Sequence, residues 1–181
     1  MTGQAPVRLP AAARRAGILD AAELEFARHG LAGGRLDAIA ERAGISHPRV
    51  VQMFGSKKKL FLEVVDIAYG KIETAFERAE PTLTALGDAY VKLLRRESTV
   101  GLVVLQGYAA AADDDVRQAV RRRHLDLMKS IARLTGADPA QVRTFFATGL
   151  VQTVSSALDL PERRADTAWS GWILQLVDPA G

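Results

Sequence analysis

The sequence predicts an all-α protein with a head of three short helices and a bundle-like C-terminal body of six longer helices. Of its 181 residues, 48% are hydrophobic and only 6% are aromatic, and alanine and leucine are abundant, a composition that favours helices. Apolar residues recur at intervals of three and four along most of the chain, and the few β-branched runs lie inside this pattern. Glycines, prolines and short polar residues interrupt the pattern and mark the helix boundaries.

The three helices of the head are predicted at residues 11–29, 35–43 and 47–54. Gly30 and Gly44 follow the first and second of them, as expected for glycine at a helix C-terminus. Ser46 is a candidate N-cap for the third helix, and Pro48 suits its first turn. Two short helices joined by a turn containing glycine have the dimensions of a helix-turn-helix, which places its second helix in the major groove of DNA.

The six helices of the body are predicted at residues 57–80, from 81 onward, 98–112, 113–134, 138–158 and 161–177. Asp113 and Asp138 precede two of these helices as caps, and Gly136 ends one of them. We therefore divide the chain into a flexible arm (residues 1–10), the head (residues 11–56) and the body (residues 57–181), with the helix from residue 57 bridging the last two.

Several classes of function are not expected from the composition. The chain has no cysteine and only three histidines, which are far apart, so we expect neither a disulfide nor a metal site. No nucleophile–base pair, phosphate-binding glycine loop or cofactor motif is apparent, so we expect no enzyme activity and no cofactor. There is no secretory signal and no apolar run long enough to cross a membrane, so the expected location is the cytoplasm.

Positive charge is concentrated in the first third of the chain. Residues 1–60 contain ten Lys or Arg and five Asp or Glu, whereas the remainder contains 14 basic and 16 acidic residues. This asymmetry favours a head that binds a polyanion, and the alternative is a basic surface that serves only solubility. Lys57, Lys58 and Lys59 begin a predicted helix, where the helix dipole disfavours cations. A phosphate bound there would explain this placement.

The order of motifs in the head resembles a known family. The run ILDAAELEFARHG, then LAGGRLDAIAERAGIS, then HPRVVQMFGSKKKLF is similar to the N-terminal DNA-binding domain of the TetR family of transcriptional regulators. The resemblance covers about residues 14–62. It implies a homodimer with two recognition helices, a ligand pocket in the C-terminal domain and a last pair of helices at the dimer interface.

The resemblance and the exposed positions of the third helix together suggest a DNA-binding surface. Arg49 would read guanine and Gln52 adenine, and Lys57 would contact a phosphate. Three of the residues predicted to contact DNA also have an alternative interpretation. Ser46 could serve only as the helix cap, Val50 could pack in the interior, and His47 could be a solvated side chain. The predicted DNA-binding residues are Arg35, Ser46, His47, Pro48, Arg49, Val50, Val51, Gln52, Met53 and Lys57.

Three positions in the head depart from the family pattern. The family often has an aromatic residue at Val51 and His or Tyr at Met53, and it often has Ser or Thr where Gly34 and Arg35 stand. Arg35 would replace the missing phosphate contact with a charged one. These departures leave the target sequence of DNA open.

Polar and aromatic side chains in the apolar helices of the body are candidates for a ligand pocket, with core packing as the alternative for each. They are Tyr90, Gln106, His124, Met128, Phe145 and Gln152. The predicted dimer interface consists of Phe146, Gly149, Leu150, Thr153, Ala157, Trp169, Trp172, Ile173 and Leu176. Packing of the last two helices on each other within one chain is the alternative for these residues.

The sequence therefore predicts a transcriptional regulator that binds double-stranded DNA. We expect a repressor that binds a palindromic operator as a homodimer and responds to an unknown small-molecule effector, without a membrane partner. The alternative is a dimeric small-molecule-binding helical protein with little sequence-specific DNA binding.

Overall fold

The computed structural model describes residues 10–160, and this part of the chain consists of eight helices and contains no strand. The helices are α1 (Ala11–Gly33), α2 (Leu36–Arg42), α3 (His47–Phe54), α4 (Lys57–Glu77), α5 (Leu83–Arg96), α6 (Ser98–Ala109), α7 (Asp114–Thr135) and α8 (Pro139–Ala157). The predicted all-α class is confirmed. The ninth predicted helix (161–177) and residues 1–9 of the predicted arm lie outside the described residues.

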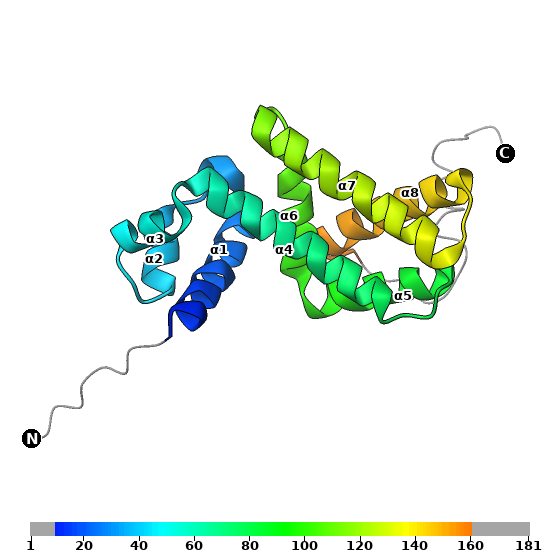
Figure 1. Ribbon diagram of the computed structural model, residues 1–181, viewed down its shortest axis with the longest axis horizontal. Helices are drawn as coiled ribbons and strands as arrows, with labels where there is room; N and C mark the ends of the chain where they lie inside the picture. Colours follow the sequence, from blue (N-terminus) through cyan, green and yellow to red (C-terminus); the bar gives the residue numbers. More distant parts are fainter. Residues whose placement is uncertain (1–9, 161–181) are drawn as a thin grey trace, which may run out of the picture.

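The eight helices form two groups along the long axis of the molecule. Figure 1 shows α1, α2 and α3 gathered at one end, whereas α5, α7 and α8 pack around the far part of α4. The helix α4 runs between the two groups, and α6 lies where they meet. A movement of α4 would therefore change the position of the head relative to the body.

A break in α1 corrects one predicted boundary. The sequence places the end of the first helix at Gly30 and a loop after it, but the chain resumes a further helical turn that ends at Gly33. Gly30 has φ 63° and ψ −173°, a conformation that is essentially restricted to glycine. The backbone N–H of Gly34 donates to the carbonyl of Gly30 at 3.0 Å and stabilises the extra turn.

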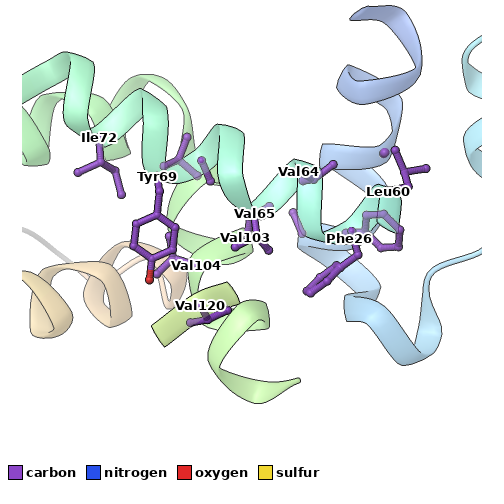
Figure 2. Packing of buried hydrophobic residues seen from close by; sticks show 14 of the residues in the cluster. Phe26, Leu60, Val64, Val65, Tyr69, Ile72, Val103, Val104 and Val120 are labelled. Carbon is purple, nitrogen blue, oxygen red and sulfur yellow. The ribbon is translucent and has the colours of Figure 1, made fainter. Parts of the chain in front are cut away.

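The helices of the head pack around an apolar interior that is continuous with the core of the body. Phe26 of α1 meets Phe61 of α4 edge-to-face, with ring centroids 5.2 Å apart, and the region around Phe26 and Leu60 is visible in Figure 2. The other buried apolar residues of this interior are Ile18, Ala22, Ile39, Ala40, Val50 and Phe54. Because all three helices of the head share this interior, the orientation of α3 is fixed by packing rather than by its own short length.

Packing between α4 and α6 forms the centre of the body. Figure 2 shows Val65, Tyr69 and Ile72 of α4 lying alongside the valines of α6. A side chain at Gly107 would lie within 3.7 Å of Val65 and 3.3 Å of Val120, so this glycine permits the close approach of α6 to α4 and α7. No described helix is long and apolar enough to cross a membrane.

The two predicted aspartate caps are present. The Asp113 carboxylate accepts from the backbone N–H of Asp115 at 3.0 Å and of Val116 at 3.2 Å. The Asp138 carboxylate accepts from Ala140 and Gln141, and the Gln141 side chain accepts in return from the Asp138 backbone, which completes a capping box. These local contacts explain why the beginnings of α7 and α8 are readable from the sequence.

Candidate nucleic-acid interface and ligand cavity

The recognition-helix candidate α3 presents a polar face to solvent. Ser46, His47, Pro48, Arg49, Val51 and Gln52 are exposed, and Met53 is half-buried. Val50 is only 1% exposed and belongs to the interior of the head, so its prediction as a DNA contact is wrong. Its neighbours Arg49 and Val51 are exposed, whereas the turn of the helix directs Val50 to the inner face of α3.

Ser46 occupies the N-cap position of α3 with an extended backbone, but its side chain makes no capping hydrogen bond. The interpretation of Ser46 as a cap is therefore incomplete. By contrast, Ser56 caps the next helix by accepting from the backbone N–H of Lys59 at 3.1 Å. The hydroxyl of Ser46 is left available to a partner outside the chain.

The predicted base-reading side chains interact with other residues in the free protein. Arg49 Nη1 donates to Gln52 Oε1 at 2.6 Å, and His47 Nδ1 lies 3.0 Å from Asp37 Oδ1 of α2. All four side chains lie at the surface, so solvent-screened contacts of this kind are weak and exchangeable. Binding of DNA would replace them with contacts to bases or phosphates.

Lys57 and Lys58, at the start of α4, have partners within the chain. Lys57 Nζ donates to the carbonyls of Ala32 and Gly34, both at 3.1 Å, so it satisfies acceptors at the end of α1. Lys58 Nζ pairs with Asp113 at 3.2 Å and with Asp115 at 2.5 Å. Hydrogen bonds to these aspartates raise the pKa of Lys58. The misplacement of lysines at a helix start is therefore partly explained by the end of α1 and the acidic start of α7.

Arg35 is exposed at the N-cap position of α2, and its guanidinium makes no capping bond. Its backbone N–H donates to Glu25 Oε1 at 3.0 Å, and Glu25 itself is buried. The buried glutamate thus fixes the backbone of Arg35 while leaving the side chain facing solvent, next to the start of α2.

Ion pairs join the head to the body. Lys71 of α4 pairs with Glu23 of α1 at 2.8 Å and with Glu97 at 3.1 Å, and the Thr99 hydroxyl donates to Glu23 at 2.5 Å. Burial opposes the charge on Lys71, but hydrogen bonds to the two glutamates leave its pKa raised. The contact therefore holds α1, α4 and the start of α6 in one arrangement.

An apolar cavity of about 240 Å³ lies in the body among α4, α5, α6, α7 and α8. Its aromatic lining consists of Tyr69, Phe76, Tyr90, Tyr108, Phe145 and Phe146, and the aliphatic lining consists of Ile72, Val104, Leu127, Ile131 and Leu150. Tyr90, His124 and Phe145, three of the predicted ligand residues, line this cavity.

Two sets of polar groups line the cavity. The Tyr69 hydroxyl donates to the Tyr108 hydroxyl at 3.2 Å, and Tyr108 lies 3.1 Å from Nδ1 of His124. Separately, the Tyr90 hydroxyl lies 2.7 Å from Thr153 Oγ1. Burial raises the pKa values of the three tyrosines and lowers the pKa of His124, so these groups favour their neutral forms.

The other three predicted ligand residues lie elsewhere. Gln106 packs against the break of α1 at Gly30, Met128 packs against the core from one side, and Gln152 lies in the surface clefts beside α5. Apolar periodicity does not tell which face of a helix meets a cavity and which meets another helix, so the sequence could not separate these residues from those that line the cavity.

The predicted dimer residues on α8 divide between two environments. Phe146, Gly149, Leu150 and Thr153 line the cavity, and Thr153 is only 2% exposed, so Thr153 is wrong as an interface residue. Ala157 is half-buried. Trp169, Trp172, Ile173 and Leu176 lie outside the described residues.

Four apolar residues of α8 and of the chain just after it are exposed, and of these only Leu150 was among the predicted interface residues. Leu150 is 49% exposed, Val154 39%, Leu158 63% and Leu160 42%. The spacing of four between Leu150, Val154 and Leu158 places them along one stripe, and this spacing was the signal that could have revealed it.

No group of three or more His, Asp or Glu side chains within residues 10–160 is arranged to hold a metal ion.

The head and the body cavity define a helix-turn-helix protein with a helical cavity-bearing domain. Residues 18–64 match the model of a family described as bacterial regulatory proteins, tetR family. This match confirms the resemblance of the head to the TetR family.

Two curated relatives match parts of the chain. An HTH-type transcriptional repressor of Streptomyces coelicolor is 43% identical over 54 residues, which are 30% of this chain and 28% of that protein. The HTH-type transcriptional activator FasR of Mycolicibacterium smegmatis is 30% identical over 115 residues, which are 60% of this chain and 49% of that protein. The chain thus spans about half or less of the length of these relatives.

Solved structures share the fold over most of the chain. A TetR-like transcriptional regulator from a Rhodococcus species has a TM-score of 0.69 at 23% identity, covering 86% of this chain and 90% of that one. FadR of Bacillus subtilis, solved in complex with stearoyl-CoA, has a TM-score of 0.67 at 19% identity and covers 90% of this chain and 96% of that one. At these identities the likeness establishes the fold.

Proposed function

We propose that this chain is a DNA-binding transcriptional regulator whose residues 11–56 bind an operator and whose residues 57–181 bind a small effector and a second copy of the chain. The observation that carries the proposal is the exposed polar face of α3, which is fixed by the apolar packing of the head and joined through α4 to a cavity. The repressor and activator names of the two relatives support a regulator but leave its direction of action open.

The proposed contacts with DNA combine two kinds of side chain. Arg49 and Gln52, which face outward on α3, would read base edges in the major groove. Arg35, Ser46 and His47 surround them with groups suited to phosphate contacts. Lys57 would reach a phosphate only by leaving the carbonyls of Ala32 and Gly34.

A homodimer would supply the second recognition helix that a palindromic operator requires. The exposed apolar stripe of α8 supports a partner surface. The effector response is supported by the cavity and by the stearoyl-CoA complex of FadR, a protein of the same fold. A ligand that prefers one position of α4 would shift the separation of the two heads.

The experiment is fluorescence anisotropy on a duplex from upstream of the gene that encodes this chain, with a scrambled duplex as control. We expect the native duplex to bind about 10³-fold tighter or more, with affinity falling steeply as salt rises. Arg49→Ala should lower affinity for the native duplex by about 10-fold to 100-fold and have little effect on the scrambled one. Arg133→Ala, which removes an equal charge from α7, is the matched control.

The alternative is a dimeric small-molecule-binding protein with little sequence-specific DNA binding. The departures from the family pattern at Gly34, Val51 and Met53 favour it, because they remove side chains that would contact DNA. Equal and weak binding of both duplexes, extended to a scan of genomic fragments without any preferred site, would contradict the regulator and support this alternative.

A further inference from the structure

We propose that the cavity of the body takes a neutral, mainly apolar molecule of about ten heavy atoms with one hydrogen-bond acceptor, and that His124, oriented by Tyr108, recognises that acceptor. The proposal deepens the proposed effector response and rests on it for its regulatory meaning. The binding chemistry itself is argued from the cavity.

The volume sets the size of the ligand. An engineered apolar cavity of about 150 Å³ holds benzene, which has six heavy atoms. The cavity here is about 240 Å³, so the same density of filling corresponds to about ten heavy atoms, the size of a small bicyclic molecule.

The lining sets the charge of the ligand. None of the described residues around the cavity is Asp, Glu, Lys or Arg. Burial raises the pKa of Tyr108 and lowers the pKa of His124, so both side chains are neutral at pH 7. A charged group placed here would lose its hydration without gaining an ion pair, which is costly.

Hydrogen bonding sets the polar group. The Tyr69 hydroxyl donates to Tyr108, so the proton of Tyr108 is directed to Nδ1 of His124, 3.1 Å away. A neutral His124 that accepts at Nδ1 carries its proton on Nε2. Within residues 10–160, no group hydrogen-bonds to Nε2. His124 thus offers a donor to an acceptor on the ligand.

The second polar pair of the cavity is already satisfied. Thr153 Oγ1 donates to the carbonyl of Gly149 at 2.8 Å, so it accepts from the Tyr90 hydroxyl, 2.7 Å away. Neither hydroxyl proton remains for a ligand. The specificity of the cavity therefore depends on the side that carries His124.

The position of this polar side links the ligand to the head. Tyr69 belongs to α4, Tyr108 to α6 and His124 to α7. An acceptor bound to His124 would be three hydrogen bonds away from α4, through His124, Tyr108 and Tyr69, and α4 continues to the head (Figure 1). A change at His124 is therefore passed to α4 through side chains that already touch.

Isothermal titration calorimetry of the full chain with three probes tests the proposal. The probes are 1-tetralone, which has one acceptor, tetralin, its apolar counterpart, and 2-naphthoate, which is charged. We expect 1-tetralone to bind about fivefold to tenfold tighter than tetralin. We expect 2-naphthoate to bind about 100-fold more weakly than 1-tetralone, or not at all.

Variants test whether His124 and Tyr108 cause the preference for 1-tetralone over tetralin. His124→Leu should abolish the preference for 1-tetralone while tetralin still binds. Tyr108→Phe should weaken that preference, because it removes the donor that fixes the tautomer of His124, and it serves if His124→Leu does not fold. Tyr90→Phe is the matched control, since it removes a hydroxyl from the same cavity that is already satisfied, and we expect the preference to remain.

Three results would overturn the proposal: equal affinities for 1-tetralone and tetralin, tighter binding of 2-naphthoate, or no binding of any probe. The titrations contain no DNA, so these results would leave the proposed DNA binding intact. If 1-tetralone binds as expected but does not release the operator, the cavity chemistry is supported and only the effector response is contradicted.

Discussion

The substitution Gly30→Ala tests whether the break in α1 fixes the junction between the head and the body. Gly30 combines φ 63° with ψ −173°, a conformation that costs a non-glycine residue about 1–3 kcal/mol. A Cβ at this position would also overlap the side-chain amide of Gln106 on α6. Relief of that overlap requires movement of Gln106 and costs about 1 kcal/mol more.

We therefore expect Gly30→Ala to lower the free energy of unfolding by about 2–4 kcal/mol. For a chain of this length the midpoint of thermal unfolding should fall by about 2–4 °C for each kcal/mol. The assay is urea unfolding followed by circular dichroism, at one protein concentration for all variants because association would contribute to stability.

Two further variants separate the causes. Gly44→Ala also places a side chain at positive φ (65°), but nothing lies within 4 Å of its Cβ, so only the backbone cost of about 1–2 kcal/mol is expected. Adding Gln106→Ala to Gly30→Ala should recover the part due to overlap and leave the backbone part. A loss below about 0.5 kcal/mol for Gly30→Ala, the range of ordinary surface substitutions, would refute this reasoning.

Three other predictions concern α3, the cavity and α8. Val50→Ala should lower the free energy of unfolding by about 1–2 kcal/mol, because Val50 is buried, whereas the exposed Val51→Ala should leave stability within about 0.5 kcal/mol; equal effects in urea unfolding would contradict the assigned faces of α3. Because burial holds the pKa of His124 below its unfolded value, the unfolded chain binds the extra proton first, so the free energy of unfolding should fall as pH decreases below about 6.5; His124→Gln should reduce this dependence in urea titrations, and an unchanged profile would contradict it. Val154→Glu combined with Leu158→Glu should convert a dimer into a monomer in light scattering, because both side chains lie on the exposed apolar stripe of α8; a dimer that persists would place the interface elsewhere.

The helices and their boundaries could be predicted because they depend on local chemistry. Asp113 and Asp138 cap their helices through bonds to the next two or three residues, and Gly136 ends α7 in the left-handed conformation. The head could also be recognised, because the spacing of its apolar residues and glycines is itself the motif. The turn after Gly30 was missed, since its stability depends on the bond from Gly34 and on packing against α6.

The interaction partners of individual side chains were harder to predict from the sequence than the helices were. Lys57 and Lys58 look unsupported in sequence, yet one meets the end of α1 and the other meets Asp113 and Asp115, 55 and 57 residues later in the chain. Three of the predicted ligand residues line the cavity, and Gln106, Met128 and Gln152 do not. Each of these outcomes depends on which helix packs on which face, and the pattern of a single helix does not contain that information.

The sequence by itself determined the all-α class and the helix-turn-helix head, because capping, periodicity and glycine placement act over a few residues, and the motifs of the head carried its resemblance to the TetR family. Only the tertiary structure decided that Val50 points inward, that Thr153 closes a pair with Tyr90, and that Tyr69, Tyr108 and His124 meet across three helices. The physical reason is that the cavity and its hydrogen bonds form between helices distant in the chain, where close packing of the whole body sets each position.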